Sequence, residues 1–139
     1  MVWRLDEEGT LTFVGSEMRS YEKGTAPWYA YRESIKKVVL SSGVLSIGEY
    51  AFSYCRNLNV ASLKGGGKKL AFGAFFECEK LVAIELPQGM ESIGNIAFSH
   101  CTNLYSVSLP SSLQEVGFES FKDCPCEKEV LQLVQKNKK

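Results

Sequence analysis

The same arrangement of residues returns every 23 positions along the middle of this chain. Phenylalanine occupies one equivalent position in four successive copies, as Phe52, Phe75, Phe98 and Phe121. Cysteine follows three residues later each time, as Cys55, Cys78, Cys101 and Cys124. Because a fixed period of about 20 to 50 residues indicates a stack of similar units, the repeat predicts a solenoid.

Residues 35–124 hold four such units, and each opens with an alternating segment typical of a half-buried strand. In the segment 81–86, Leu81, Ile84 and Leu86 are expected to face the core, with the residues between them facing outward. Pro87 and Pro110 would end two of these strands, because proline lacks the N–H that a strand ladder needs. Further along each unit, alanine, phenylalanine and cysteine fall at helical spacing, so we expect a short helix or 3₁₀ turn on the opposite wall. The phenylalanines would stack into a spine.

Residues 1–34 do not follow the repeat and are expected to cap the first unit. Residues 2–5 and 10–14 are strand-like and predict a hairpin, and Gly24 to Arg32 predicts a short helical turn with Thr25 as its cap. Four bulky aromatics suit covering the first unit: Trp3, Trp28, Tyr29 and Tyr31. The alternative for these rings is an aromatic ligand cage.

Residues 125–139 break the repeat and predict a C-terminal capping helix and tail. Val130, Leu131 and Val134 would share one helix face. Acidic residues lead and lysines trail, which complements the helix dipole. A fifth, degenerate strand is the alternative.

Composition excludes several classes of protein. The 139 residues carry 16 basic and 16 acidic side chains, whereas a nucleic-acid-binding chain usually has a basic excess. No apolar run is long enough to insert into a membrane, and the N-terminus does not resemble a signal peptide. The chain as given would therefore be cytoplasmic if complete.

Five cysteines in a short chain raise the question of disulfides or metal. Four of them occupy one repeated position among apolar residues, which favours a column of buried, reduced thiols. A bridge between neighbouring units remains an alternative, because parallel rungs lie about 4.8 Å apart. With one histidine in the chain, we expect neither a metal site nor a cofactor. Cys126 lies off the column and is expected to be more exposed.

The frame Leu-x-x-Ile-x-Leu-Pro-x-x-x-x-x-Ile-Gly-x-x-Ala-Phe-x-x-Cys at 81–101 resembles the cysteine-containing leucine-rich repeats of bacterial surface antigens. Trp3, Leu5 and Asp6, with the segment Ala-Pro-Trp-Tyr at 26–29, also resemble the cap that precedes such repeats. The resemblance implies an α/β repeat: a right-handed leucine-rich-repeat solenoid with a parallel β-sheet on one face, an N-terminal hairpin and helix cap, and a C-terminal capping helix. It also implies protein binding, adhesion and a secreted or cell-surface location, and it transfers no catalytic residues.

Repeat proteins bind through columns of outward-facing residues. The strand face should present four columns: Lys36, Asn59, Val82 and Tyr105; Lys37, Val60, Ala83 and Ser106; Val39, Ser62, Glu85 and Ser108; and Ser41, Lys64, Pro87 and Pro110. Tyr105 is the best anchor, because aromatics are enriched at interface hot spots. Lys36, Asn59 and Glu85 are further candidates.

The opposite wall should present a more apolar set, namely Tyr50, Tyr54, Phe72, Phe76, Ile96 and Phe118. Phe72 and Phe118 share one column, two units apart. If exposed, this set marks an interaction surface; the alternative is that some of these side chains pack into the core.

Two other features have simpler explanations than chemistry. The segment Lys64–Lys69, Lys-Gly-Gly-Gly-Lys-Lys, lacks the spacing of a phosphate-binding loop and is expected to be a flexible turn. His100 precedes Cys101, but adjacent residues on a turn point apart, so no nucleophile pair is expected.

The sequence therefore predicts a non-enzymatic protein–protein interaction module of the surface or secreted type. A stand-alone intracellular inhibitor or adaptor that docks on one protein is the alternative. Self-association through exposed aromatics is a third possibility, and the partner is not identifiable.

Overall fold

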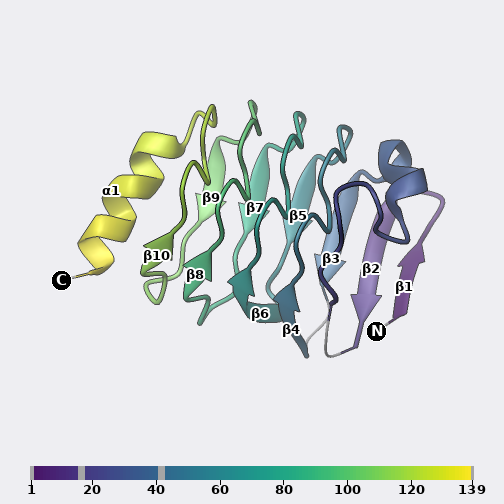
Figure 1. Ribbon diagram of the computed structural model, residues 1–139, viewed down its shortest axis with the longest axis horizontal. Helices are drawn as coiled ribbons and strands as arrows, with labels where there is room; N and C mark the ends of the chain where they lie inside the picture. The colour runs from purple at the N-terminus through teal and green to yellow at the C-terminus, as the bar shows by residue number, and fades with distance from the viewer. Residues whose placement is uncertain (1, 16–17, 41–42, 139) are drawn as a thin grey trace.

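The computed structural model describes residues 2–15, 18–40 and 43–138, with only the backbone described at position 45. The rungs stack side by side in one row, with β1 (Val2–Leu5) at one end and α1 (Glu127–Asn137) at the other (Figure 1). Two sheets run along this row. The first has the order β1-β2-β3-β5-β7-β9, and the second β10-β8-β6-β4.

The first sheet is parallel except at the hairpin that begins it. It comprises β1, β2 (Thr10–Val14), β3 (Lys37–Leu40), β5 (Val60–Ser62), β7 (Ala83–Glu85) and β9 (Ser106–Ser108). Ala61 pairs with Ile84, and Ile84 with Val107, so each rung advances the register by one sequence repeat. Leu81, Ile84 and Leu86 are buried, as the alternating pattern predicts.

The second sheet contains the short strands β4 (Val44–Ile47), β6 (Gly66–Leu70), β8 (Ser92–Ile93) and β10 (Glu115–Val116). The sequence did not reveal this sheet, because its strands are only two to five residues long. The flexible turn expected at 64–69 is wrong for residues 66–69, because they belong to β6. A Cβ at Gly66 would lie 2.7 Å from Leu40 Cδ1, so a larger residue there would require the Leu40 side chain to shift.

Of the two structures expected on the opposite wall, a short helix or a 3₁₀ turn, no continuous helix forms, but the turns are closed by bonds between residues three apart, as in a 3₁₀ turn. Consecutive turns form this wall, and residues in the left-handed region interrupt any helix, such as Ile96 (φ 50°) and His100 (φ 64°). Alternate amides close turns within the rung, as Ser99 N–H does to Ile96 O at 3.1 Å. The amides between them donate to the next rung, as Phe98 N–H does to Ser120 O at 2.7 Å. In an α-helix these amides would bond within the helix, whereas here they form hydrogen bonds between rungs.

The phenylalanine spine is present at the centre of the stack. The ring centroids of Phe52 and Phe75 lie 5.1 Å apart, those of Phe75 and Phe98 5.3 Å, and those of Phe98 and Phe121 5.0 Å. All four rings are fully buried or nearly so.

The N-terminal hairpin and the 3₁₀ helix η1 (Tyr29–Ser34) cap the first rung. Trp28 continues the spine: its ring lies 5.8 Å from that of Phe52, and its Nε1–H donates to Ala51 O at 2.6 Å. Trp3 packs against Trp28 at 6.0 Å, and Tyr31 against Trp3 at 6.3 Å, so the rings cover one another rather than surround a ligand. Thr25 does not cap the helix; its hydroxyl donates to Glu22 O at 2.8 Å.

The helix α1 closes the other end, and the alternative of a fifth strand is wrong. Val130 and Val134 are buried, but Leu131 is 50% exposed, so it does not share their face as predicted. Cys126 was expected to be more exposed than the column cysteines, yet it is buried at the N-cap position of this helix. Among the described residues, no helix is both long and apolar enough to cross a membrane.

Candidate protein-binding surfaces

The outer face of the first sheet presents the predicted columns. Lys36, Asn59, Glu85 and Tyr105 are exposed, and Tyr105 stands out with 67% of its surface accessible. A shallow depression crosses β3, β5 and β7 and is lined by Lys37, Val39, Val60, Ala61, Ser62, Ala83 and Glu85. Glu85 forms an ion pair with Lys64 at 3.1 Å beside it.

The fourth predicted column of this face is not formed. Pro87 and Pro110 are buried rather than outward, because the chain turns there toward the second sheet. Ser41 lies outside the described residues. Three columns therefore remain as a flat, mixed surface.

The turn wall presents a more apolar feature, which we call the aromatic ridge: Phe72, Asn95 and Phe118, one residue from each of three successive rungs. Phe118 is 70% exposed and Phe72 is 37% exposed, and Asn95 between them is also exposed. The Phe72 ring contacts that of Tyr50 edge-on at 5.5 Å, and this contact half-buries Tyr50. Ile96 is half-buried as well.

Backbone bonds between rungs hold the ridge in place. The residue after each ridge position has a positive φ: 63° at Gly73, 50° at Ile96 and 50° at Glu119. Gly73 N–H donates to Asn95 O at 3.0 Å, and Ile96 N–H donates to Phe118 O at 2.9 Å. The left-handed turn therefore directs the ridge side chain outward while its carbonyl joins the preceding rung.

The Asn95 side chain is fixed across one rung. Its Oδ1 accepts a hydrogen bond from Phe118 N–H at 2.7 Å. A Cβ at Gly117 would lie 2.6 Å from Asn95 N and against Asn95 Oδ1, so glycine makes room for this bond. Because Oδ1 faces the Phe118 amide, the Nδ2 group is left as a donor, and no described residue accepts from it.

A second row of rings lies beside the ridge. Tyr54 contacts Phe76 at 5.5 Å, and Phe76 contacts His100 at 5.8 Å, both edge-on. His100 Nδ1 lies 2.7 Å from Asp123 Oδ2. The predicted residues Tyr54 and Phe76 are half-buried in this row.

The N-terminal cap reaches this row, which the sequence did not indicate. Lys23 Nζ lies 5.0 Å from the centre of the Tyr54 ring. The hydrogen bond to Tyr54 raises the pKa of Lys23. Arg56 also lies over the same ring, at 6.0 Å. Tyr54 is therefore occupied by cations of its own chain.

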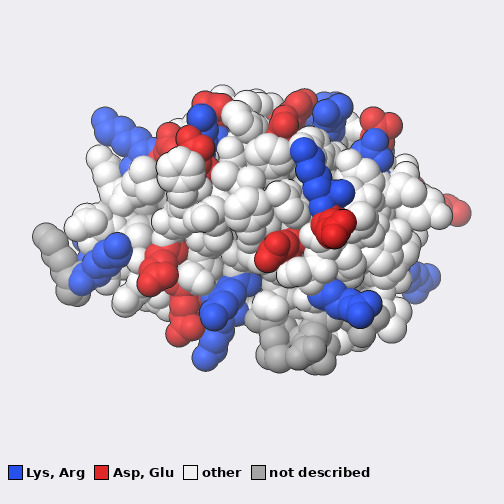
Figure 2. All heavy atoms as spheres, in the orientation of Figure 1, with Lys and Arg blue, Asp and Glu red and all other residues white. Residues whose placement is uncertain are grey.

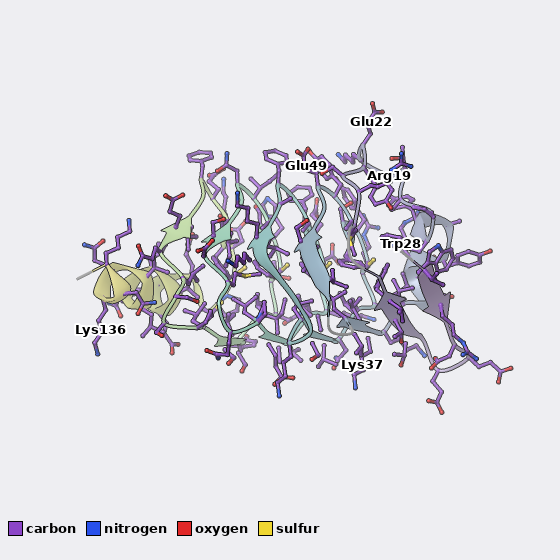
Figure 3. All side chains as sticks on the ribbon, turned by 90° about the horizontal axis from the view of Figure 1, so that it is seen from below. Arg19, Glu22, Trp28, Lys37, Glu49 and Lys136 are labelled. Carbon is purple, nitrogen blue, oxygen red and sulfur yellow. The ribbon has the colours of Figure 1, made fainter. Side chains whose placement is uncertain are left out.

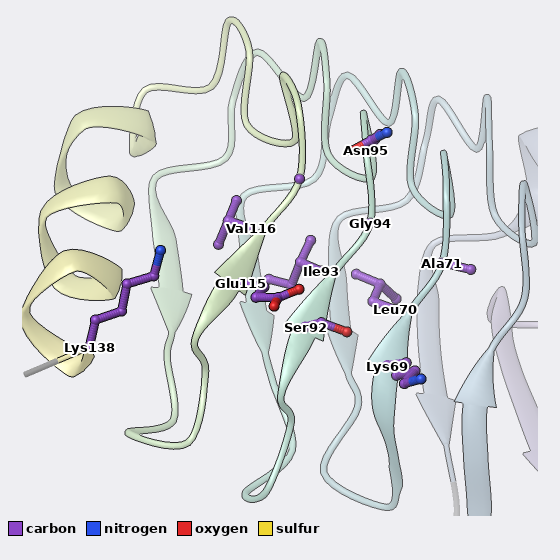
Figure 4. A pocket seen from close by; sticks show the side chains of 11 residues that line it. Lys69, Leu70, Ala71, Ser92, Ile93, Gly94, Asn95, Glu115, Val116 and Lys138 are labelled. Atoms are coloured by element: carbon purple, nitrogen blue, oxygen red, sulfur yellow. The ribbon is translucent and has the colours of Figure 1, made fainter.

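A shallow groove runs alongside the ridge on the second sheet (Figure 4). Its lining includes the small residues Ala71, Gly94 and Gly117 and the side chain of Asn95. Lys69, Ser92 and Glu115 lie along its other side, and Lys138 lies toward its end. The groove and the ridge together form one elongated surface across three rungs.

Charge is mixed on the one face of the molecule that Figure 2 shows. Acidic and basic side chains are interspersed with uncharged ones on the face shown in Figure 2, without a continuous field of either sign. Glu49 and Lys37 lie on opposite sides of the solenoid (Figure 3). A partner would therefore be selected by local contacts rather than by net charge.

The candidates for chemistry do not converge. Cys101 is buried in the core, while His100 lies on the turn wall beside Asp123. Within the described part of the chain, no group of three or more histidine, cysteine or acidic side chains could hold a metal ion. The arrangement displays side chains for contact but assembles no reacting pair from those predicted.

The comparisons with known proteins agree with this architecture. The family model of the BspA type leucine-rich repeat region matches residues 27–136 in six copies, so the chain belongs to the BspA-type leucine-rich repeat family. Leucine-rich repeat proteins of this bacterial family are typically non-enzymatic, and the family suggests a protein-interaction module. No curated protein sequence matches the chain.

Solved structures show the same fold. A leucine-rich repeat protein of T. pallidum is 26% identical with a TM-score of 0.68, over 88% of this chain and 64% of that one. A leucine-rich cell surface protein of Faecalibacterium prausnitzii is 18% identical with a TM-score of 0.56, over 88% of this chain and 44% of that one. A leucine-rich repeat protein of Bacteroides ovatus is 21% identical with a TM-score of 0.55, over 84% and 35%. The chain thus spans less than two thirds of each of these proteins.

Proposed function

We propose that this chain is a protein-recognition module of the surface or secreted, adhesion-like type, and that it binds its partner through the aromatic ridge. The observation that carries this proposal is the contrast between the two sets of phenylalanines. Spine rings such as Phe98 are fully buried, whereas the ring of Phe118, which belongs to the aromatic ridge, is 70% exposed. Exposed aromatic rings on a fixed backbone are the usual anchors of protein interfaces.

The ridge is favoured over the sheet face because its anchors are grouped. Phe72 and Phe118 lie in one column with a polar residue between them, next to a groove. On the sheet face, Tyr105 is a single exposed ring, and its column is otherwise Lys36, Asn59 and Val82. An interface with one anchor has less apolar surface to bury.

The proposal also draws on the F. prausnitzii protein, which is described as a cell surface protein. A surface or secreted role for this chain would give it access to proteins of other cells. The experiment should therefore sample both an extracellular and an intracellular source of partners.

Capture of partners by the purified chain tests the proposal. Baits would be the unaltered chain, the double variant Phe72→Ala with Phe118→Ala, and Tyr105→Ala as a control with an equally exposed ring on the other face. Each bait would be incubated separately with a host-cell surface extract and with a lysate of the source cell. We expect a specific protein from the surface extract that is lost only with the double variant.

Other outcomes would change the account. Loss only with Tyr105→Ala would move the site to the sheet face, and a partner found only in the lysate would favour an intracellular adaptor. Concentration-dependent light scattering that disappears in the double variant would assign the ridge to a second copy of the chain. Capture of nothing specific from either source would contradict a binding function.

A further inference from the structure

We propose that the aromatic ridge binds a proline-rich segment of its partner in the polyproline II conformation, with a basic residue at one end of that segment. This inference rests on the proposed function, because it names the chemistry of the partner for the same surface. Three observations support it: the spacing of Phe72 and Phe118, the free donor on Asn95, and the position of Glu49.

The spacing of the two rings matches this conformation. Adjacent rungs advance by 5.0 to 5.3 Å at the spine, so Phe72 and Phe118, two rungs apart, are separated by about 10 Å along the solenoid. A polyproline II helix has 3 residues per turn and rises about 3.1 Å per residue, so its same-face side chains recur about every 9 Å. Two prolines three positions apart could therefore contact the two phenylalanines at once.

Other peptide conformations fit the ridge less well. An extended strand places same-face side chains about 6.7 Å apart, which does not match the two rings. An α-helix returns to one face after seven residues, about 10.5 Å, so spacing alone does not distinguish it. The chemistry of Asn95, the residue between the rings, distinguishes the two conformations.

Asn95 supplies that distinction. Its Oδ1 is engaged by Phe118 N–H at 2.7 Å, which leaves its exposed Nδ2 group to donate outward. The carbonyls of an α-helix are already bonded within the helix. Those of polyproline II form no internal hydrogen bonds and can accept from a partner. A hydrogen-bond donor between two aromatic rings therefore suits an extended proline-rich chain, a ligand that docks on aromatic-lined surfaces.

Glu49 adds charge complementarity at one end. It occupies the same column, one rung before Phe72, and its side chain is exposed. Its backbone N–H donates to Ser20 Oγ at 3.2 Å, which fixes the main chain there. Its carboxylate forms no ion pair with any described residue. A lysine or arginine that precedes the prolines would lie within reach of it.

The backbone keeps this site preorganised. Tyr50 N–H donates to Phe72 O at 3.0 Å, and the bonds to Asn95 O and Phe118 O continue the series from rung to rung. Binding would therefore order few groups on the protein side. Polyproline II is itself a low-entropy ligand, so the cost of association is small for both partners.

Fluorescence anisotropy with defined peptides tests the inference. The probe is a labelled peptide of one arginine followed by nine prolines, and the control peptide replaces the prolines with alternating glycine and serine. We expect saturable binding of the proline peptide and none of the control. A labelled amphipathic helical peptide of equal charge serves as the competing ligand class.

Matched variants locate the contact. Asn95→Asp keeps an oxygen for the Phe118 amide and removes the outward donor, so binding of an uncharged all-proline peptide should weaken about five-fold. Phe118→Ala should weaken it at least about ten-fold, and Tyr105→Ala should leave it unchanged. Glu49→Gln should weaken binding of the arginine-bearing peptide only. Circular dichroism verifies that each variant is folded.

The outcomes separate this inference from the proposed function. Equal binding of the proline peptide by Asn95→Asp, by Phe118→Ala and by the unaltered chain would overturn the inference. So would preference for the helical peptide, or failure to bind the proline peptide at all. In these cases, capture of a partner that is lost with the ridge double variant would still support the ridge as a protein-binding surface.

Discussion

Cys101 donates its S–H to the carbonyl oxygen of Phe75, the spine residue one rung earlier, at 3.2 Å. Cys78 does the same to Phe52 at 3.2 Å, and Cys124 to Phe98 at 2.9 Å. The cysteine of one repeat is thus linked to the phenylalanine of the preceding repeat. The ring supplies apolar contact between rungs, and the thiol gives the phenylalanine carbonyl a second hydrogen bond besides the one from the cysteine amide of its own rung.

Removal of a spine ring should destabilise the protein strongly. Phe75→Ala deletes a fully buried side chain between two stacked rings, and such truncations cost about 3–5 kcal/mol in the free energy of unfolding. Denaturation with urea measures this change. Phe118→Ala is the control, because an exposed ring should contribute less than about 0.5 kcal/mol. An unchanged midpoint for Phe75→Ala would show that the spine does not stabilise the stack.

The thiols should be inert while the protein is folded. All five are free and buried, and burial raises the pKa of Cys78 and of Cys101. A thiol must ionise and be reached by solvent to react. We expect a thiol reagent at pH 8 to label no cysteine in the native protein and all five in guanidinium chloride. Rapid labelling of the native protein would mean that the column is open to solvent.

Stability should fall in alkaline solution. Burial raises the pKa of Cys55 from 9.0 to about 12. Above pH 9 the unfolded chain loses this proton while the folded chain keeps it, so the free energy of unfolding decreases as pH rises from 9 toward 12. Urea denaturation at pH 8 and pH 10.5 measures the loss. Cys55→Ala should show a smaller loss over the same interval; an equal loss would attribute the effect to other groups.

Position 117, where glycine makes room for the Asn95 side chain, should not tolerate a larger residue. Gly117→Ala would place a Cβ 2.6 Å from Asn95 N and 2.8 Å from Gly94 C, so the rungs would have to separate. Overpacking of this kind costs about 1–3 kcal/mol. Thermal denaturation would detect it, and the Phe118 amide should lose protection from hydrogen exchange as its bond to Asn95 is displaced. Unchanged protection at Phe118 would show that the hydrogen bond survives.

The repeated positions could be predicted from the sequence, because equivalent residues lie in the same environment in every repeat. Four phenylalanines and four cysteines in register indicate a spine and a column whichever structure joins them. The alternation of Leu81, Ile84 and Leu86 likewise identifies a strand with one buried face.

The turn wall and the end of the chain could not be predicted in the same way. Ala97, Phe98 and Cys101 have helical spacing, but alternate amides of this segment, such as that of Phe98, donate to the neighbouring rung. A single unit carries no signal of that neighbour. Cys126 was misjudged because its burial depends on where α1 docks. The orientation of Asn95 depends on space above Gly117 that only the stacked structure reveals.

The most direct test of the account compares two equally exposed rings on opposite faces. The measurement is the dissociation constant of the captured partner for Phe118→Ala and for Tyr105→Ala, each relative to the unaltered chain. The account predicts at least about a ten-fold increase for Phe118→Ala and no change for Tyr105→Ala. An increase confined to Tyr105→Ala would place the binding site on the first sheet and contradict the assignment of the aromatic ridge.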